Sequence, residues 1–270
     1  MDRIPLLAEA ATRPFGFPGC RHCPYRHVGA PNVCLGCFEH AAPVRQSLAP
    51  VTRCGACGRP GPSHRPCANP LCARADRGWS AVFALGLHEA ALRRSIASYK
   101  YRGERWWAGV FARLLAGYLR AHPTWFEEYD LVVPMPAYQG EGARRPWDPV
   151  GSLFADLVVL IGSEWDCDDR LIAKTTETPP MSGRSRRERV ALAEGALRPA
   201  LVVPERRRVV GRRILVVDDV LTEGSSLREV AVALRAAGAE EVAGLVLARR
   251  GGESPGRAGS SGDQSFARSL

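Results

Sequence analysis

The stretch that decides the fold runs Arg213-Ile214-Leu215-Val216-Val217-Asp218-Asp219-Val220-Leu221-Thr222-Glu223-Gly224-Ser225-Ser226. Four consecutive apolar residues, 214–217, predict a strand that is buried on both faces, as in parallel sheets. Two carboxylates follow this strand, and a turn rich in glycine and hydroxyl side chains follows the carboxylates. Apolar residues then recur at helical spacing as far as Gly238, which predicts a helix. The turn is therefore expected between the carboxyl end of a strand and the amino end of a helix.

That turn has the composition of an anion site. Free backbone N–H groups and the positive end of the helix dipole converge at the amino end of a helix, and both favour a phosphate. Gly224 lets the backbone come close to a ligand. Three hydroxyls add donors, from Thr222, Ser225 and Ser226. Asp218 and Asp219 would repel a phosphate, so we expect them to bind ribose hydroxyls or hydrated magnesium beside it. The expected ligand is a sugar phosphate.

These residues resemble the phosphoribosyl-pyrophosphate (PRPP) signature of the type I phosphoribosyltransferases, in which an apolar strand, two acids and a Thr-x-Gly-x-Ser/Thr loop follow one another. The resemblance implies an α/β fold with a Rossmann-like, mainly parallel sheet. It also implies that Asp218 and Asp219 are the catalytic acids and that PRPP is held by Thr222, Glu223, Gly224, Ser225 and Ser226. The alternative for the stretch is a βα unit whose two acids only cap a helix.

Glu223 stands where that family usually carries a small or hydroxyl residue. A carboxylate that pointed into the loop would oppose a phosphate at short range. We therefore expect the side chain of Glu223 to point away from the phosphate.

Eight of the nine cysteines lie in the first 72 residues, in short-spaced pairs. Such spacings favour tetrahedral zinc over disulfides in a cytosolic protein. Eight thiolates fill two zinc sites, so the nearby histidines are expected to be bystanders, and the spacing leaves open whether each ion binds consecutive or interleaved pairs. Cys167 has no partner in the sequence and is expected to be inert. The expected ligands are Cys20, Cys23, Cys34, Cys37, Cys54, Cys57, Cys67 and Cys72.

The charge of the chain is concentrated at its amino end. The formal net charge is +9, and residues 1–78 hold ten Arg against four acids. A basic balance favours nucleic acid or another polyanion. However, eight thiolates with two zinc ions would bring this segment down to about +2. A structural role for the zinc module and a role in docking a protein partner therefore stay equally open. We expect loss of one thiolate to unfold the module and to leave the second domain folded.

Composition divides the chain into three parts. We expect a zinc-binding module at 1–78, a phosphoribosyltransferase domain at 79–250 and a disordered tail at 251–270, which is rich in Gly and Ser. The periodicity predicts strands at 81–87, 130–136, 171–173, 201–203 and 242–248, and helices at 88–99, 105–121 and 150–160. The sequence has no apolar run long enough for a bilayer and no signal-peptide pattern, so a cytoplasmic protein without membrane insertion is expected. The oligomeric state is left open, a homo-oligomer included.

Two basic segments precede the central part of the domain. The step Lys100-Tyr101-Arg102-Gly103 is either a helix junction or an anion contact at the edge of the site. The segment 137–149 follows the predicted strand 130–136, and a loop at this place holds pyrophosphate in type I phosphoribosyltransferases. By that resemblance, Arg144 and Arg145 are expected to neutralise the leaving pyrophosphate.

A third basic segment follows the predicted strand 171–173. It contains Lys174, Arg184 and a capping box, Ser185-x-x-Glu188, that predicts the start of a short helix. In a phosphoribosyltransferase this segment would be a flexible cationic lid that closes over pyrophosphate and excludes water. The alternative is a solvated basic face without a ligand.

These features, in this order, are similar to the ComF family, which joins an amino-terminal zinc module to a phosphoribosyltransferase domain. The similarity covers residues from about 20 to 250 and includes the paired CxxC knuckles, the Val-Pro-x-Pro strand end, the lid and the PRPP loop. The chain departs from the family where 145–148 reads Arg-Pro-Trp-Asp instead of Arg-Gly-Phe-Asn. The lid also has Met181 and Leu192 in place of Gln and Asn. The family is tied to DNA uptake in naturally competent bacteria.

Two classes of function follow from the sequence. The first is a transferase that binds magnesium and PRPP, passes the phosphoribosyl group to a nitrogen acceptor and releases pyrophosphate. The second is a non-catalytic protein of competence, DNA uptake or nucleotide sensing, whose partner is DNA or a DNA-translocation ATPase. A base-recognition element would separate these classes, and the sequence shows none.

Overall fold

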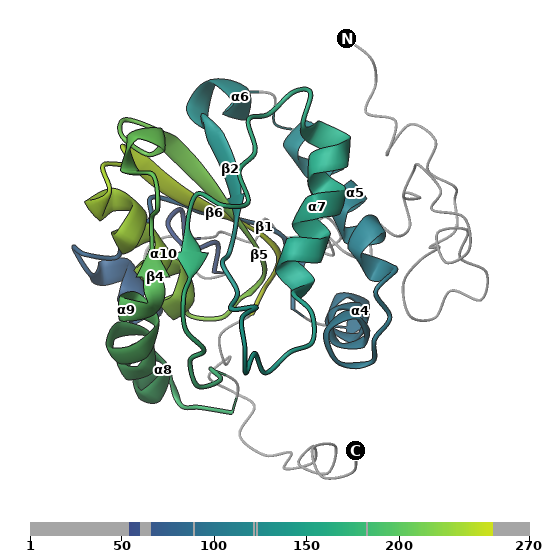
Figure 1. Cartoon of the computed structure of the whole chain (residues 1–270), viewed down its shortest axis with the longest axis horizontal. Coiled ribbons are helices and arrows are strands. Elements are labelled where there is room, and N and C mark those ends of the chain that lie inside the picture. Colours follow the sequence, from purple (N-terminus) through teal and green to yellow (C-terminus); the bar gives the residue numbers. More distant parts are fainter. Residues whose placement is uncertain are drawn as a thin grey trace.

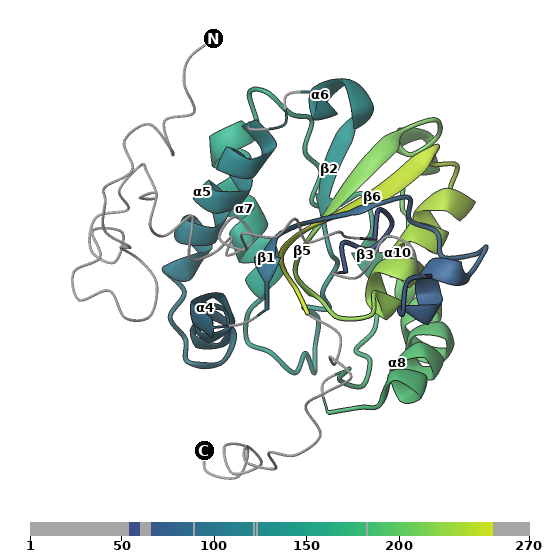
Figure 2. The same cartoon turned by 180° about the vertical axis from the view of Figure 1, so that it is seen from behind.

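A four-stranded sheet lies at the centre of the computed structural model, which describes residues 54–59, 66–88, 90–120, 122, 124–181 and 183–250. Its strand order is β1-β6-β5-β2, and each neighbouring pair is parallel (Figures 1 and 2). The strands are β1 (Val82–Leu87), β2 (Leu131–Pro134), β5 (Arg213–Leu221) and β6 (Glu241–Arg249). The predicted mainly parallel α/β sheet is therefore confirmed. The predictions for the first four cysteines and for the tail 251–270 concern residues outside the described ranges.

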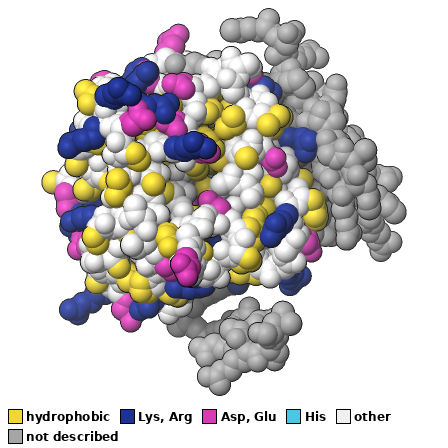
Figure 3. Space-filling view, in the orientation of Figure 1, with side chains coloured by type: hydrophobic (Ala, Val, Ile, Leu, Met, Phe, Trp, Pro, Cys, Tyr) yellow, Lys and Arg dark blue, Asp and Glu magenta, His cyan; other side chains and the backbone are white. Residues whose placement is uncertain are grey.

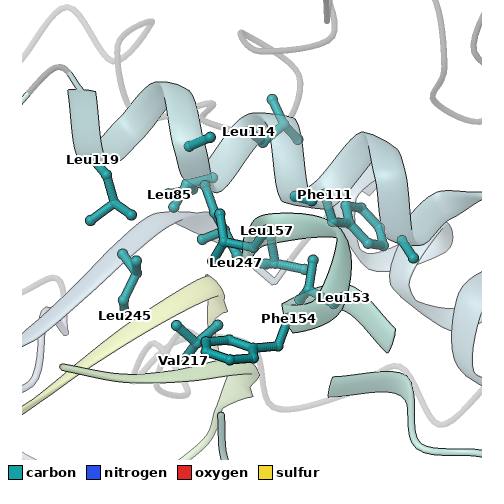
Figure 4. Packing of buried hydrophobic residues seen from close by; sticks show 14 of the residues in the cluster. Leu85, Phe111, Leu114, Leu119, Leu153, Phe154, Leu157, Val217, Leu245 and Leu247 are labelled. Atoms are coloured by element: carbon teal, nitrogen blue, oxygen red, sulfur yellow. The ribbon is translucent and has the colours of Figure 1, made fainter. Parts of the chain in front are cut away.

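Alternate side chains of β5 enter two hydrophobic cores, one on each face of the sheet. Leu215 and Val217 pack with helices α4 (Ala90–Tyr101), α5 (Trp107–Arg120) and α7 (Pro149–Ile161), and Figure 4 shows Val217 among leucines and phenylalanines of this core. Ile214 and Val216 pack on the opposite face with helix α10 (Ser225–Ala236). A strand that is buried on both faces reads as a continuous apolar run, which is why 214–217 identified it.

Short elements connect the main strands and helices, and Figure 1 labels α6, α8, α9 and β4 among them. The 3-10 turn η2 (Pro70–Ala73) precedes β1, α6 (Trp125–Glu128) precedes β2, and η4 (Arg206–Arg208) precedes β5. Strands β3 (Ala173–Lys174) and β4 (Leu201–Val202) form a separate antiparallel pair. Between them lie α8 (Arg186–Leu192), the π-helical turn η3 (Ala193–Leu197) and α9 (Arg198–Ala200). This pair therefore joins the two ends of the predicted lid.

Local sequence signals set the ends of two helices. The side chain of Asp148 accepts a hydrogen bond from the N–H of Val150 at the start of α7, and Pro149 takes the first helical position. Ser185 and Glu188 form the predicted capping box at the start of α8. Both caps fix the segments that flank the site, namely the loop before α7 and the lid.

Two strand predictions need correction. β5 does not end before the two acids but continues through them to Leu221, because β6 supplies ladder partners as far as Arg249. β3 lies at 173–174 instead of 171–173, since its antiparallel partner β4 reaches only these residues. Within the described ranges, none of the helices is both long and apolar enough to cross a bilayer.

Candidate functional site: acid pair, phosphate loop and cysteine cluster

The acid pair lies near the carboxyl end of β5, inside the strand. Asp219 is only 3% exposed, and its Oδ2 lies 2.5 Å from Nζ of Lys100 at the end of α4. The backbone N–H of Asp219 donates to Oδ1 of Asp218 at 2.8 Å. Burial, together with the charge of Asp219, raises the pKa of Asp218 to about 8. Asp218 is therefore mostly protonated at neutral pH, and Lys100 faces the pair.

Lys100 is the functional residue that the sequence reasoning did not place among the site residues. The Lys-Tyr-Arg-Gly step was assigned either to a helix junction or to an anion contact, and the structure shows that its lysine contacts a carboxylate. Burial alone would lower the pKa of Lys100, but the charges of Asp219 and Asp218 raise it above its ordinary value. One signal was available: only two of the 37 basic residues are lysines, Lys100 and Lys174, so a lysine is unusual in this chain.

The loop 222–226 joins β5 to α10 as the sequence predicts. Gly224 adopts a left-handed conformation, with φ of 96°, and is the N-cap residue of α10. No side-chain hydrogen bond caps this helix. Ser225 is 7% exposed, and its Oγ has no hydrogen-bond partner among the described residues. Donors without protein partners therefore gather at the amino end of a twelve-residue helix.

The side chain of Glu223 is paired with the lid helix. Its carboxylate lies 2.6 Å from Nη2 of Arg189 and 3.8 Å from Nε of Arg186, both in α8. The Glu223 side chain is 17% exposed, so this pair is largely shielded from water. The negative charge that does not fit the family pattern is thus neutralised by two guanidinium groups of the lid.

The predicted pyrophosphate residues lie in the segments expected, but they do not all converge. The backbone N–H of Arg144 donates to Glu177, and its Nη2 donates to the carbonyl of Thr178, so this arginine joins the loop 137–149 to the lid segment. The guanidinium of Arg145 lies over the ring of Tyr101, 5.4 Å from its centroid. Among the described residues, neither arginine forms a hydrogen bond or an ion pair with Asp218 or Asp219.

Two cavities flank these segments. One, of about 770 Å³, lies between the loop 134–140, α7 and β3, and Lys174 and Asp148 line it. Burial lowers the pKa of Lys174, although Glu177 lies 3.8 Å away. The other cavity, of about 790 Å³, lies between the lid, the phosphate loop and residues of the cysteine-rich segment. Its basic residues are Arg59, Arg184, Arg186, Arg189, Arg249 and Arg250.

The second cavity has the charge of a polyanion site. Six arginines line it, and Glu223 is the one acid in its lining. By contrast, on the outer face seen in Figure 3, Lys and Arg side chains are interspersed with Asp and Glu. Positive charge is therefore concentrated in this cavity, beside Thr222 of the phosphate loop.

Four cysteines form a cluster that fits zinc. The Sγ atoms of Cys54, Cys57, Cys67 and Cys72 all lie within 4.8 Å of one another. Two of the separations are 3.9 Å (Cys54 to Cys72) and 3.7 Å (Cys57 to Cys67). A tetrahedral ion with Zn–S bonds of about 2.3 Å places its sulfurs about 3.8 Å apart. The third and fourth cysteine pairs, consecutive in sequence, therefore share one site.

Cys167 lies apart from this cluster. Its backbone forms an isolated parallel β-bridge with Val132, and the residue lines the first cavity. Burial and the charge of Asp166 raise the pKa of Cys167 to about 11, so the thiol is protonated at neutral pH. The inertness of Cys167 stays a prediction, which this raised pKa favours.

Comparison with known proteins supports a phosphoribosyltransferase domain. A family model described as "Phosphoribosyl transferase domain" matches residues 176–257, which include the lid, the acid pair and the phosphate loop. Competence protein F of Haemophilus influenzae is 27% identical over 241 residues, which cover 85% of this chain and 96% of that protein. DNA utilization protein YhgH of Escherichia coli K12 is 28% identical over 226 residues, 83% of this chain and 91% of that protein.

The resemblance to the ComF family is confirmed. Both ComF-type relatives align over most of their own length, so the similarity includes the cysteine-rich segment as well as the phosphoribosyltransferase domain. The chain thus combines a phosphoribosyltransferase domain with a cysteine cluster that could bind zinc.

Proposed function

We propose that the chain binds PRPP, with magnesium, at Asp218, Asp219 and the loop 222–226. The observation that supports this best is the hydroxyl of Ser225, which is buried without a partner at the amino end of α10. A buried polar group without a hydrogen bond costs about 1–3 kcal/mol, so a site of this kind is built for a ligand that supplies an acceptor. A phosphate at a helix amino end supplies acceptors and also meets the helix dipole.

The acid pair is suited to the ribose part of such a ligand. Asp219, paired with Lys100, would accept a hydrogen bond from a ribose hydroxyl. Asp218 holds a proton near neutral pH and, once that proton is lost, would bind magnesium directly or through water. Magnesium, when bound, would offset the charge of the pyrophosphate.

The reaction that this complex supports is transfer of the phosphoribosyl group. A nitrogen acceptor would form a bond to C1 of ribose, the bond from C1 to the pyrophosphate oxygen would break, and pyrophosphate would leave with the electron pair. We assign Arg144, Arg145, Lys174 and Arg184 to the pyrophosphate side. Support for this comes from Lys174 and Arg184, each of which lines a cavity.

A second candidate is a non-catalytic role in competence or DNA utilization. The printed names of the relatives concern those processes. One structural observation favours this role: Glu223 ties the phosphate loop to Arg189, so the lid is already engaged by the protein itself. In this role the pocket would sense a nucleotide, and DNA or a DNA-translocation ATPase would be the partner.

We also propose that the Cys54, Cys57, Cys67 and Cys72 cluster holds zinc and that the other four cysteine ligands hold a second ion. The proposed division at residues 78 and 79 is one of sequence composition. The described part of the module packs on the sheet, because Leu71 belongs to the same core as β5 and α10.

Calorimetry on the full-length protein tests the proposal. Ser225→Ala should lower the affinities for ribose 5-phosphate and for magnesium-PRPP to a similar degree, about tenfold, because both ligands use the phosphate loop. Asp219→Asn should weaken magnesium-PRPP far more than ribose 5-phosphate. Ser163→Ala, at an exposed serine after α7, is the matched control and should change neither affinity.

Pyrophosphate release over a panel of nucleobases then separates the two candidates. Release with one base supports the transferase. Tight PRPP binding without release for any base supports the non-catalytic role. Absence of binding for both sugar phosphates would refute the site itself.

A further inference from the structure

The phosphate loop is held from behind by two side chains. Three consecutive carbonyls, that of Leu221 at the end of β5 and those of Thr222 and Glu223 in the loop, accept hydrogen bonds from these side chains. Nη1 of Arg249 donates to Leu221 at 3.1 Å and also to Thr222. Nδ2 of Asn69 donates to Glu223 at 2.9 Å. Both donors are buried, with Arg249 2% exposed and Asn69 0% exposed.

The same two side chains are bound to the cysteine cluster. Nε of Arg249 donates to the carbonyl of Cys57 at 2.8 Å, and its Nη2 lies 3.7 Å from the Cys57 Sγ. The backbone N–H of Asn69 donates to Sγ of Cys67 at 3.4 Å. Each of the two residues therefore joins a cysteine of the cluster to a carbonyl of the loop.

A third contact supports the loop. Nε1 of Trp79 donates at 3.0 Å to the carbonyl of Ala56, which lies in the Cys54–Cys57 turn, here called the knuckle. The indole ring lies against Gly224, because a Cβ at that position would be 3.1 Å from the ring. The knuckle, the indole and the loop thus form one packed unit.

This arrangement determines which way the loop N–H groups point. In a planar trans peptide, the C=O of one residue and the N–H of the next point in opposite directions. Carbonyls 221–223 face Asn69 and Arg249, so the N–H groups of Thr222, Glu223 and Gly224 face the other way. No hydrogen bond between described residues uses the N–H of Glu223 or Gly224. Successive N–H groups on one side of a loop form an anion-binding concavity.

We propose that Asn69 and Arg249 are positioning residues of the phosphate loop, and that a metal ion in the Cys54–Cys57–Cys67–Cys72 cluster controls the affinity of the loop for phosphate. This rests on the proposed function, in which the loop binds a sugar phosphate. Metal binding fixes the knuckle, because in such small sites the binding free energy is folding free energy. Loss of the metal would release Cys57 and Cys67, the residues that orient Arg249 and Asn69. The loop carbonyls would then lose their fixed direction.

Asn69→Asp is the sharpest variant. The Oδ1 of Asn69 accepts from the N–H of Leu71 at 3.2 Å, and an aspartate keeps this acceptor. The variant replaces the amide donor to Glu223 by a carboxylate oxygen, which faces a carbonyl oxygen. We expect ribose 5-phosphate to bind at least tenfold more weakly, with the zinc content unchanged. Backbone amides of 222–226 should exchange hydrogen for deuterium faster than in the parent protein.

Arg77→Lys is the matched control. Arg77 holds the knuckle through the carbonyls of Cys72, at 3.1 Å, and Trp79, at 2.8 Å, but it contacts no loop carbonyl. The affinity of the Arg77→Lys protein for ribose 5-phosphate should stay within twofold of that of the parent protein. Arg249→Lys is a second test variant, because lysine keeps the charge but cannot reach the knuckle and the loop together. It should weaken binding as Asn69→Asp does.

Zinc removal from the parent protein completes the test. Chelation should lower the affinity for ribose 5-phosphate at least tenfold, and added zinc should restore it. If the parent protein binds no ribose 5-phosphate, the proposed function is wrong and this inference falls with it. If the parent binds, but Asn69→Asp, Arg249→Lys and chelated protein all bind within twofold, the positioning role is overturned and the phosphate site stands.

Discussion

The variant Lys100→Met should destabilise the folded protein, because it removes the positive charge that faces the buried acid pair. The side chains of Lys100 and Asp219 are 17% and 5% exposed, and their charged atoms are 2.5 Å apart. At that separation and an effective dielectric constant of about 20, the Coulomb attraction is on the order of 6–7 kcal/mol. Desolvation offsets part of it, so removal of one partner should lower the free energy of unfolding by about 3–5 kcal/mol.

The loss should depend on pH. Burial and the charge of Asp219 already raise the folded-state pKa of Asp218 in the parent protein, and loss of Lys100 removes a charge that lowers it. The folded state then binds more protons than the unfolded state, so stability falls as pH rises through this range. Urea unfolding should therefore show a larger loss at pH 8 than at pH 6. Magnesium should stabilise the variant more than the parent, because it replaces the missing positive charge.

The charge-neutral double variant Lys100→Met/Asp219→Asn is the control and should recover most of the lost stability. A loss under about 1 kcal/mol at pH 8, or a double variant no more stable than Lys100→Met alone, would refute the reasoning.

Three further predictions concern the loop, the acids and the metal. Glu223→Thr should raise the mobility of the lid, seen as faster amide exchange in α8, and leave ribose 5-phosphate affinity within about threefold; a hundredfold gain would show that the native loop is blunted by its carboxylate. Magnesium-PRPP affinity should rise from pH 6 through pH 8 and level off only above about pH 9, because Asp218, with a pKa of about 8, must lose its proton to bind magnesium; calorimetry on Asp218→Asn should show a flatter profile. Elemental analysis of the full chain should find two zinc ions, and Cys72→Ser should lose one of them; one zinc per parent chain would contradict the two-site proposal.

Much of the fold follows from local patterns in the sequence. The apolar run 214–217 identifies a strand buried on both faces, and the capping box at Ser185 places the start of α8. The length of β5 did not follow, because two adjacent acids read as the end of a strand. They stay in the ladder because β6 provides partners as far as Arg249. Strand pairing is a long-range property that a single segment does not contain.

The site was predicted less completely than the fold. The loop residues 222–226 are local in sequence, and their turn chemistry identified them. Lys100 and Asp219 are more than a hundred residues apart, and the same holds for Asn69 and Glu223. Such contacts appear only once the chain has folded. The pairing of the third and fourth cysteine pairs was open for the same reason, since spacing gives ligands but not their neighbours.

The charges of the site favour a ligand that displaces one ion pair. Lys100 faces Asp219, and Arg189 and Arg186 face Glu223, so these groups are balanced without a ligand. A sugar diphosphate that enters the arginine-lined cavity would compete with Glu223 for the lid arginines. Its phosphates accept bidentate hydrogen bonds at least as well as a carboxylate does. Binding would then free Glu223 and let α8 follow the ligand, which gives the lid a reason to move only when the anion is present. Without a ligand the lid is therefore held by its ion pairs with Glu223, and its opening should be coupled to ligand charge.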